Sequence, residues 1–202
     1  MAGNTINYAT TLAEALKTLR EGGVILYPTD TVWGLGCDAT DPDAVARIYG
    51  IKQRDDSKSL VLLASDMDMI ARYVKEIPYI AQDLVEVNDK PMTIIYPDAL
   101  TAPRGDRYHL ASNTVAEDGS VGIRIPMSDY LKELVFKLGR PLVSTSANIS
   151  GEPTPQKFDD IPEEIRNAVD YIVDRRLERE STGLASQIIK VGTDCTVKII
   201  RK

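Results

Sequence analysis

Short apolar runs separated by helix-capping and turn signals are the feature that most limits how this chain can fold. Runs of β-forming residues predict buried strands, and they lie at 24–27, 60–64, 92–96, 121–125 and 141–144. We expect helices at 41–50, 66–75, 78–87, 128–138 and 162–168, and short strands near 170–173, 186–191 and 196–200. Because strands and helices do not alternate strictly, the sequence predicts an α/β fold with a mixed sheet and helices packed on it.

Residue types at the helix ends support the predicted starts and ends of the helices. Thr11 and Glu14 have the spacing of a capping box, in which the two side chains bond to free amides of a first helical turn. The helix that follows should end at Gly22-Gly23. Asp41-Pro42 combines an N-cap residue with proline at the first helical position, so a helix is expected to begin there.

The composition indicates a single soluble domain over residues 1–202, with 43% hydrophobic and 27% charged residues and no visible repeat or linker. No apolar run approaches the roughly 18 residues that cross a bilayer, and the N-terminus has no signal-peptide pattern. We therefore expect a cytoplasmic protein without a membrane partner. Cys37 and Cys195 are then reduced thiols, and the single histidine, His109, argues against most metal sites and Ser-His-Asp triads.

Two segments resemble known loops without fixing a function. Residues 97–119 form a long polar stretch, which in a compact domain is usually functional or mobile. Gly34-Leu-Gly36-Cys-Asp-Ala39 matches a dinucleotide fingerprint on paper. That motif requires a strand that runs directly into the helix, but six residues separate Tyr27 from Gly34, and the next helix starts at Asp41. The order of the elements therefore argues against a dinucleotide site.

A cluster of cations follows the second predicted helix, at Lys52, Arg54 and Lys58. Fixed cations can hold a polyphosphate, as phosphoryl and nucleotidyl transfer require. Cations at a helix C-terminus are also common for a simpler reason, because they complement the helix dipole and stay solvated. The residues alone leave both interpretations open. The net charge of −6 indicates that any anion site is local rather than spread over the surface.

Two further features suggest ligand binding. The stretch Val143-Ser-Thr-Ser-Ala-Asn148 delivers hydroxyls and an amide at the end of a predicted strand, which suits phosphate or ribose binding but also a capped turn. Arg124 lies within the apolar strand 121–125. A guanidinium there needs an anionic partner, which is either a protein carboxylate or a ligand carboxylate.

Four blocks follow one another along the chain: GGVILYPTDTVWGLGCDA, IYGIKQRDDSKSLVLLA, VGIRIP and STSANISGEPTP. In this order they resemble the YrdC/Sua family of threonylcarbamoyl-AMP synthases, in its short, single-domain form. The resemblance implies an open, twisted α/β sheet with a large, locally basic concave face. It also implies an enzyme, a nucleotidyltransferase that joins L-threonine, bicarbonate or CO₂, and ATP into threonylcarbamoyl-AMP and releases pyrophosphate. Mg²⁺ would be carried by the ATP phosphates.

The resemblance also assigns roles to individual residues. The nucleotide-binding set would be Lys52, Arg54, Lys58, Ser120, Ser146, Asn148 and Thr154, of which Lys52 and Arg54 would be catalytic. The threonine-binding set would be Thr31, Arg124, Ser144 and Ser186. The sequence departs from the family pattern at Asp55, where many members have proline after K-x-R, and at Ala185-Ser186-Gln187, where the family has P-S-T.

The product would supply threonylcarbamoyladenosine modification of tRNA beside the anticodon, completed by downstream transfer proteins, with a weak tRNA contact by this chain. We expect the turn at Thr29-Asp30-Thr31 to select threonine over valine through the substrate hydroxyl, and Trp33 to pack the turn or wall the pocket. The alternative is a non-catalytic RNA-binding module with the same fold. Acidic net charge and the absence of aromatic stacking runs argue against strong general RNA binding.

Overall fold

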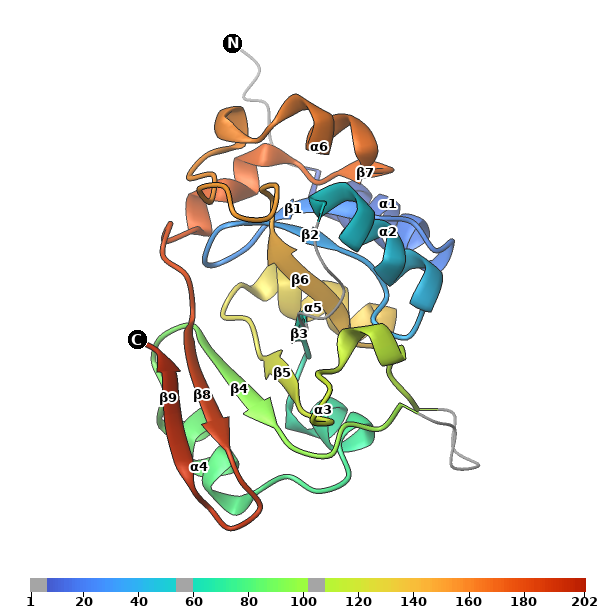
Figure 1. Cartoon of the computed structure of the whole chain (residues 1–202). Coiled ribbons are helices and arrows are strands. Elements are labelled where there is room, and N and C mark those ends of the chain that lie inside the picture. Colours follow the sequence, from blue (N-terminus) through green and yellow to red (C-terminus); the bar gives the residue numbers. More distant parts are fainter. Residues whose placement is uncertain (1–6, 54–59, 102–107) are drawn as a thin grey trace.

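A computed structural model describes residues 7–53, 60–101 and 108–202. Within these residues one nine-stranded sheet runs in the order β7-β1-β2-β6-β3-β5-β4-β8-β9 (Figure 1). The strands are β1 (Ile25–Pro28), β2 (Trp33–Gly36), β3 (Val61–Leu63), β4 (Met92–Tyr96), β5 (Val121–Arg124), β6 (Leu142–Ser146), β7 (Tyr171–Ile172), β8 (Gln187–Val191) and β9 (Val197–Arg201). The pairs β1–β7, β3–β5 and β4–β8 are parallel and the remaining pairs are antiparallel, so the predicted mixed sheet is confirmed.

The helices cover the sheet and its ends (Figure 1). They are α1 (Tyr8–Arg20), α2 (Pro42–Lys52), α3 (Met67–Tyr73), α4 (Tyr79–Val87), α5 (Asp129–Leu138) and α6 (Glu163–Ala168), with 3₁₀ turns η1 (Ser112–Thr114), η2 (Phe158–Asp160) and η3 (Arg175–Glu180). In Figure 1, α5 lies behind the central strands, and α1 packs against it. The apolar side chains between these layers form a continuous buried cluster whose largest members are Trp33, Tyr27, Tyr73 and Tyr96.

Two of the predicted helix starts had different outcomes. Asp41 caps α2 as predicted, because its Oδ1 accepts from the amides of Asp43 at 3.0 Å and Ala44 at 3.2 Å. The capping box at Thr11 was wrong: α1 begins earlier, and the Asn7 Oδ1 accepts from the Thr10 amide at 3.1 Å. Thr11 instead lies inside the helix on its buried face. Asn7 and Thr11 are both suitable N-cap residues, so the sequence allows two helix starts. The longer helix includes Tyr8, whose ring packs edge-on against Tyr130 of α5 with the centroids 5.4 Å apart.

The hairpin between β1 and β2 was not predicted. The sequence suggested a turn leading toward a helix, but residues 33–36 pair antiparallel with β1, in a register that sets Tyr27 opposite Gly34. Glycine is disfavoured in strands, so the strand signal was absent. Glycine is required at position 36, since a Cβ there would lie 2.6 Å from the Tyr27 ring and 2.7 Å from the Val143 carbonyl oxygen. The same hairpin shows that these glycines do not open a nucleotide-binding helix.

Strand β6 extends further than the expected 141–144. It reaches Ser146, because Gly34 and Leu35 of β2 pair with Ser146 and Thr145. The polar residues of this stretch therefore stand on a strand at the centre of the sheet rather than in a free loop. Strands β8 and β9 form a C-terminal hairpin, and β9 is the outer edge of the sheet (Figure 1).

Candidate functional site

The turn between β1 and β2 is polar and yet buried. Thr29, Asp30 and Thr31 are at most 6% exposed. The Thr29 hydroxyl organises the turn, since its Oγ1 accepts from the amides of Thr31 at 3.0 Å and Val32 at 3.1 Å. It lies 2.7 Å from both the Val32 carbonyl oxygen and the Thr31 Oγ1. The turn is thus held by its own side chains, as threonine favours.

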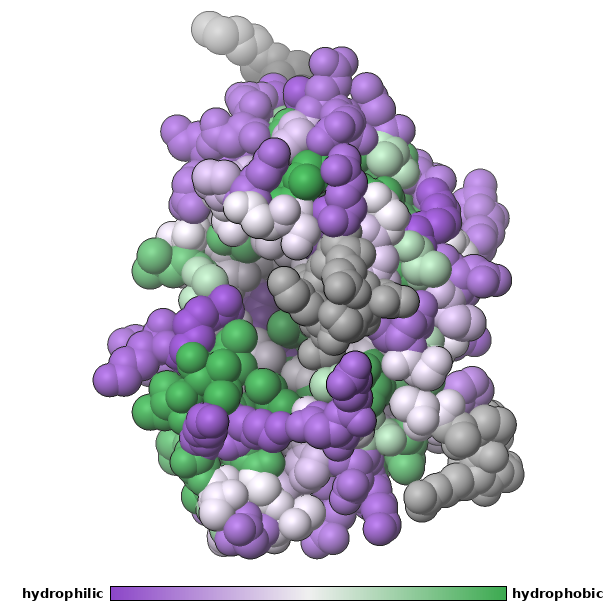
Figure 2. Space-filling view, in the orientation of Figure 1, coloured by the Kyte–Doolittle hydropathy of each residue, from purple (hydrophilic) through white to green (hydrophobic). Residues whose placement is uncertain are grey.

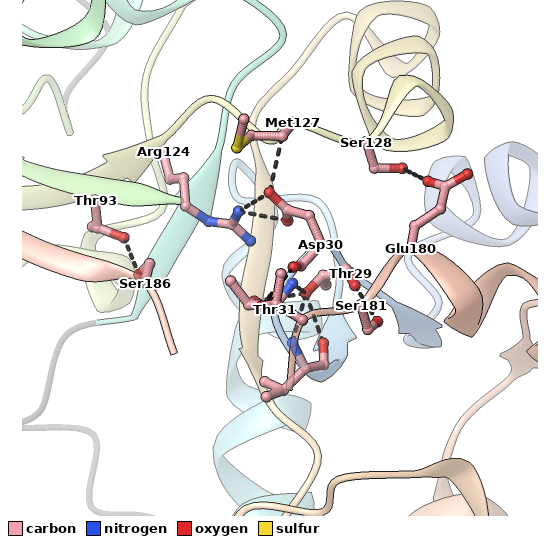
Figure 3. Close-up of polar contacts among 12 residues, drawn as sticks. Thr29, Asp30, Thr31, Thr93, Arg124, Met127, Ser128, Glu180, Ser181 and Ser186 are labelled. Atoms are coloured by element: carbon pink, nitrogen blue, oxygen red, sulfur yellow. Dashed lines mark hydrogen bonds and ion pairs between the residues drawn. The ribbon is translucent and has the colours of Figure 1, made fainter. Parts of the chain in front are cut away.

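Asp30 pairs with Arg124 across this turn (Figure 3). Arg124 ends β5, and its Nη1 donates to Asp30 Oδ1 at 2.6 Å and to Oδ2 at 2.7 Å. The Met127 amide also donates to Asp30 Oδ2, at 2.9 Å. The two side chains are only 3% and 7% exposed, so each charge needs the other. Among the described residues, all hydrogen bonds of this guanidinium are made by Nη1, which leaves Nε and Nη2 for a ligand.

A cavity of about 320 Å³ opens beside this pair, within the size range of small-molecule sites. Figure 2 shows the corresponding face hollowed near its centre. All four residues of the predicted threonine set line the cavity, together with two of the predicted nucleotide set: Thr31, Arg124, Ser144 and Ser186, and Ser146 and Thr154. The sheet therefore brings together residues from four widely separated parts of the chain.

The other predicted nucleotide residues are placed differently. Lys52 is 2% exposed, and its Nζ donates to the carbonyl oxygens of Ser146 at 2.5 Å and Asn148 at 2.7 Å. The side-chain Nδ2 of Asn148 in turn donates to the carbonyl oxygens of Ile149 and Glu152. Both residues thus shape the loop after β6 and do not line the cavity. Ser120, also outside the cavity lining, donates to Asp118 at 2.5 Å. Arg54 and Lys58 lie outside the described residues.

The segment after η3 lies directly on the polar turn. The Ser181 hydroxyl donates to the Thr29 carbonyl, and the amides of Thr182 and Gly183 donate to the carbonyls of Asp30 at 3.1 Å and Thr31 at 2.7 Å. This bonding positions Ser186, whose Oγ lies 2.8 Å from the Thr93 Oγ1 (Figure 3). The departure of Ala185-Ser186-Gln187 from the family pattern thus does not remove Ser186 from the site.

Sequence reasoning missed Arg201 as a site residue. Arg201 lies on β9 and lines the cavity, where its Nε and Nη2 donate to the Ser186 carbonyl oxygen at 2.9 and 2.7 Å. Burial lowers the pKa of this guanidinium, and no carboxylate in the described ranges forms an ion pair with it. A single arginine in a basic C-terminal strand gives no sequence signal of its own.

Trp33 lines the cavity next to the turn, and Glu178 holds its indole ring in place. Trp33 is fully buried, lines the cavity and donates from Nε1 to Glu178 Oε1 at 2.8 Å. The Phe158 backbone amide donates to the same oxygen at 2.9 Å. The ring of Phe158 packs against that of Trp33, with the ring centroids 5.1 Å apart. Both expectations for Trp33, that it packs the turn or walls the pocket, describe where it lies.

Solved structures define the class of this protein through its fold. E. coli YciO superposes with a TM-score of 0.75 at 25% identity, over 97% of this chain and 90% of that one. P. abyssi Sua5 complexed with L-threonine superposes with a TM-score of 0.76 at 28% identity, over 93% of this chain. This chain spans 52% of that longer protein. The fold is therefore the open mixed α/β sheet that these proteins share.

Sequence comparison then gives the family. The model of the Sua5/YciO/YrdC family, described as "Telomere recombination", matches residues 17–202. The threonylcarbamoyl-AMP synthase of Stenotrophomonas maltophilia is 35% identical over 177 residues, covering 87% of this chain and 89% of that protein. That of Chromohalobacter salexigens is 36% identical over 157 residues, covering 76% and 79%. The chain belongs to the Sua5/YciO/YrdC family.

The described residues offer neither a cluster of metal ligands nor a membrane-spanning helix. No group of three or more His, Cys, Asp and Glu side chains in these ranges could hold a metal ion. Nor does any helix in the same ranges have the length and apolar character needed to cross a membrane.

Proposed function

We propose that this chain is a threonylcarbamoyl-AMP synthase, which joins L-threonine, bicarbonate or CO₂, and ATP and releases pyrophosphate. The observation that carries the proposal is the buried Arg124, held on one side by Asp30 and lining a cavity on the other. A desolvated guanidinium with two unused nitrogens is suited to a carboxylate ligand. The relatives that bear this enzyme name match most of the chain.

The threonine half of the site lies around Arg124. Its Nε and Nη2 would hold the α-carboxylate, while Thr31, Ser144 and Ser186 provide hydroxyls around the rest of the amino acid. Asp30 fixes the guanidinium before the substrate arrives, so little reorganisation is needed on binding. The P. abyssi Sua5 complex with L-threonine supports an amino-acid site in this fold.

The nucleotide half would lie on the side of Ser146 and Thr154. Arg201, which bonds to Ser186, adds a positive charge to the same cavity. Lys52 would act without lining the cavity, because it holds the loop after β6 and would place a fixed charge near the phosphates. Arg54 and Lys58 are proposed as further phosphate ligands on their sequence positions alone. Mg²⁺ would arrive with ATP, carried by its phosphates.

The chemistry needs positioning more than a reactive side chain. The free amine of threonine attacks CO₂ and loses a proton, which gives a carbamate. A carbamate oxygen then attacks the α-phosphorus of ATP in line, a P–O bond forms, and the bond to pyrophosphate breaks. Fixed cations offset the charge that develops on the departing pyrophosphate. We place this reaction in the cytoplasm, where the product would feed downstream proteins that modify tRNA.

The direct test is incubation of the purified chain with ATP, threonine and bicarbonate, and detection of the adenylate by mass. We expect the adenylate and pyrophosphate only when all three substrates are present. Loss of the product on omission of bicarbonate separates this reaction from simple threonine adenylation. Salt-sensitive RNA binding without any adenylate would support the alternative, an RNA-binding module, and overturn the proposal.

A further inference from the structure

The outer strand of the sheet, β9, has a free edge along its whole length (Figure 1). All five of its residues are exposed, including Val197 at 47% and Ile199 at 58%. The opposite edge strand, β7, has only two residues and so offers little to a partner. A five-residue edge with large exposed apolar side chains is a surface that another strand can cover.

The backbone of β9 presents its unpaired groups in a regular order. The Gly192 amide in the turn before β9 donates to the Thr196 carbonyl oxygen at 2.9 Å. Bonded and non-bonded positions alternate in an antiparallel ladder, so the next position that bonds to β8 is Lys198. The amides and carbonyls of Val197 and Ile199 therefore point away from β8, toward the side where no strand of the described ranges pairs with β9.

One face of this edge is apolar. Val197 and Ile199 lie opposite Val191 and Ile189 of β8, so these four side chains project from the same face of the sheet. Val191 belongs to the buried core, and Ile189 packs against it. The row of apolar side chains that begins in the core thus continues to the free edge, where Val197 and Ile199 remain about half exposed.

The other face of the edge is basic. Lys198 lies opposite Lys190, and a register shift beside Ile188 brings Arg201 to the same face, which is the face of the cavity. The segment 196–202 contains no acidic residue. Within the described ranges Lys198 forms no ion pair. In a chain of net charge −6, this strand is therefore a locally positive edge.

Charge decides which kind of strand fits this edge. If two copies of β9 paired with each other, Lys198, Arg201 and Lys202 of both chains would gather along one seam. Like charges across a strand pair are destabilising, and lysine on an edge strand protects against self-association. A strand that carries carboxylates is favoured by the same charges. The edge thus fits an acidic partner better than a second copy.

We propose that β9 is a docking edge for an extended segment of a partner protein, in which acidic residues alternate with apolar ones. The segment adds a strand to the sheet through the backbone groups of Val197 and Ile199. Its apolar side chains cover these two residues, and its carboxylates face Lys198 and Arg201. Because Arg201 also lines the cavity, the partner lies beside the candidate site. This inference goes beyond the proposed function and does not depend on it.

The test uses a capped heptapeptide in which glutamate and valine alternate, and a matched peptide with lysine in place of glutamate. Amide hydrogen exchange followed by NMR reports on single residues of the edge. At a peptide concentration about tenfold above its dissociation constant, exchange of the Val197 and Ile199 amides should slow about tenfold. The Lys198 amide, which already bonds to β8, should change little. The lysine peptide should protect neither edge amide.

Three substitutions separate the contributions of backbone and charge. Ile199→Pro removes an outward amide that β8 does not use, so it should weaken binding of the glutamate peptide by about fivefold or more. Ile199→Val is its matched control, because it keeps the amide and an apolar side chain, and it should bind as wild type does. Lys198→Glu should weaken binding of the glutamate peptide and strengthen binding of the lysine peptide.

The inference is overturned if the glutamate peptide leaves both edge amides unprotected, or if the two peptides protect them equally. A wild-type dimer in sedimentation whose edge amides are already protected would assign β9 to a second copy instead. Protection by an oligouridylate but not by the glutamate peptide would assign it to RNA. If Ile199→Pro does not fold, the wild-type comparison and Lys198→Glu still decide. Failure of the proposed function would appear as missing adenylate and would leave peptide binding unchanged.

Discussion

At the scale of single residues, the buried ion pair of Arg124 and Asp30 organises the candidate site. A guanidinium in an apolar strand required an anion, and Asp30 of the polar turn supplies it. The structural ion pair is present and uses Nη1 alone, whereas the second alternative, a ligand anchor made by Nε and Nη2, stays a prediction. Pairing across 94 positions depends on strand order, which local residue patterns do not encode.

The cysteines provide a prediction at this scale. Cys37 is fully buried, and burial raises the pKa of its thiol far above neutrality, whereas Cys195 is exposed in the turn between β8 and β9. At pH 8 an alkylating reagent should modify Cys195 rapidly and Cys37 only after unfolding. Adenylate formation should survive both alkylation and Cys195→Ser, since the chemistry uses no thiol. Mass mapping of the labelled peptides checks this, and rapid labelling of Cys37 in folded protein would contradict it.

At the scale of elements, strands and helices with a clear apolar pattern were predicted within a few residues. Strand β4 has the predicted limits, and α5 ends at Leu138 before Gly139, which adopts the expected left-handed backbone with φ of 74°. Strand β2 was not predicted, because Gly34 and Gly36 are not typical strand residues. The glycine at position 36 is explained by the close approach of the Tyr27 ring. Close packing between elements is therefore what local patterns could not supply.

Lys52 gives the element-scale prediction. Its ammonium joins the end of α2 to the loop after β6 through two carbonyl oxygens. Lys52→Met should leave these oxygens without that donor and lower the free energy of unfolding by about 1–3 kcal/mol, as for other buried polar groups. Urea unfolding at neutral pH measures the loss.

Lys190→Met is the matched control for this prediction. Lys190 pairs with Asp118 at 2.5 Å on the surface, where both side chains are at least 40% exposed. Solvent screening should keep the cost of its removal below about 1 kcal/mol. Equal losses in the two variants would show that Lys52 does not hold the loop.

The pair Asp118–Lys190 adds a pH dependence. The hydrogen bond from Lys190, followed by those from Ser120, lowers the pKa of Asp118 to about 2 from its ordinary value of 3.8. A depressed carboxyl pKa stabilises the folded state above the ordinary value and loses this effect as the pH falls toward the folded value. The stability difference between wild type and Asp118→Asn should therefore be constant near neutrality and shrink between about pH 4 and pH 2. A difference that stayed constant down to pH 2 would contradict this assignment.

At the scale of the whole molecule, the site exists only because the sheet is assembled. The hairpin β1–β2, strands β5 and β6, and the C-terminal segment each contribute residues to one cavity. All four residues of the threonine set that the family resemblance implied line this cavity, and their contact with threonine stays a prediction. The resemblance did not foresee Arg201, because no motif block covers the last strand, nor that Lys52 would serve the loop behind the cavity.

In the proposed site, one cavity holds threonine by its carboxylate at Arg124. The most direct measurement is threonine binding by Arg124→Lys, which keeps a positive charge beside Asp30 and loses the planar fork. We predict a threonine dissociation constant raised by at least about tenfold, with that of ATP unchanged. An unchanged threonine dissociation constant in the folded variant would contradict the claim.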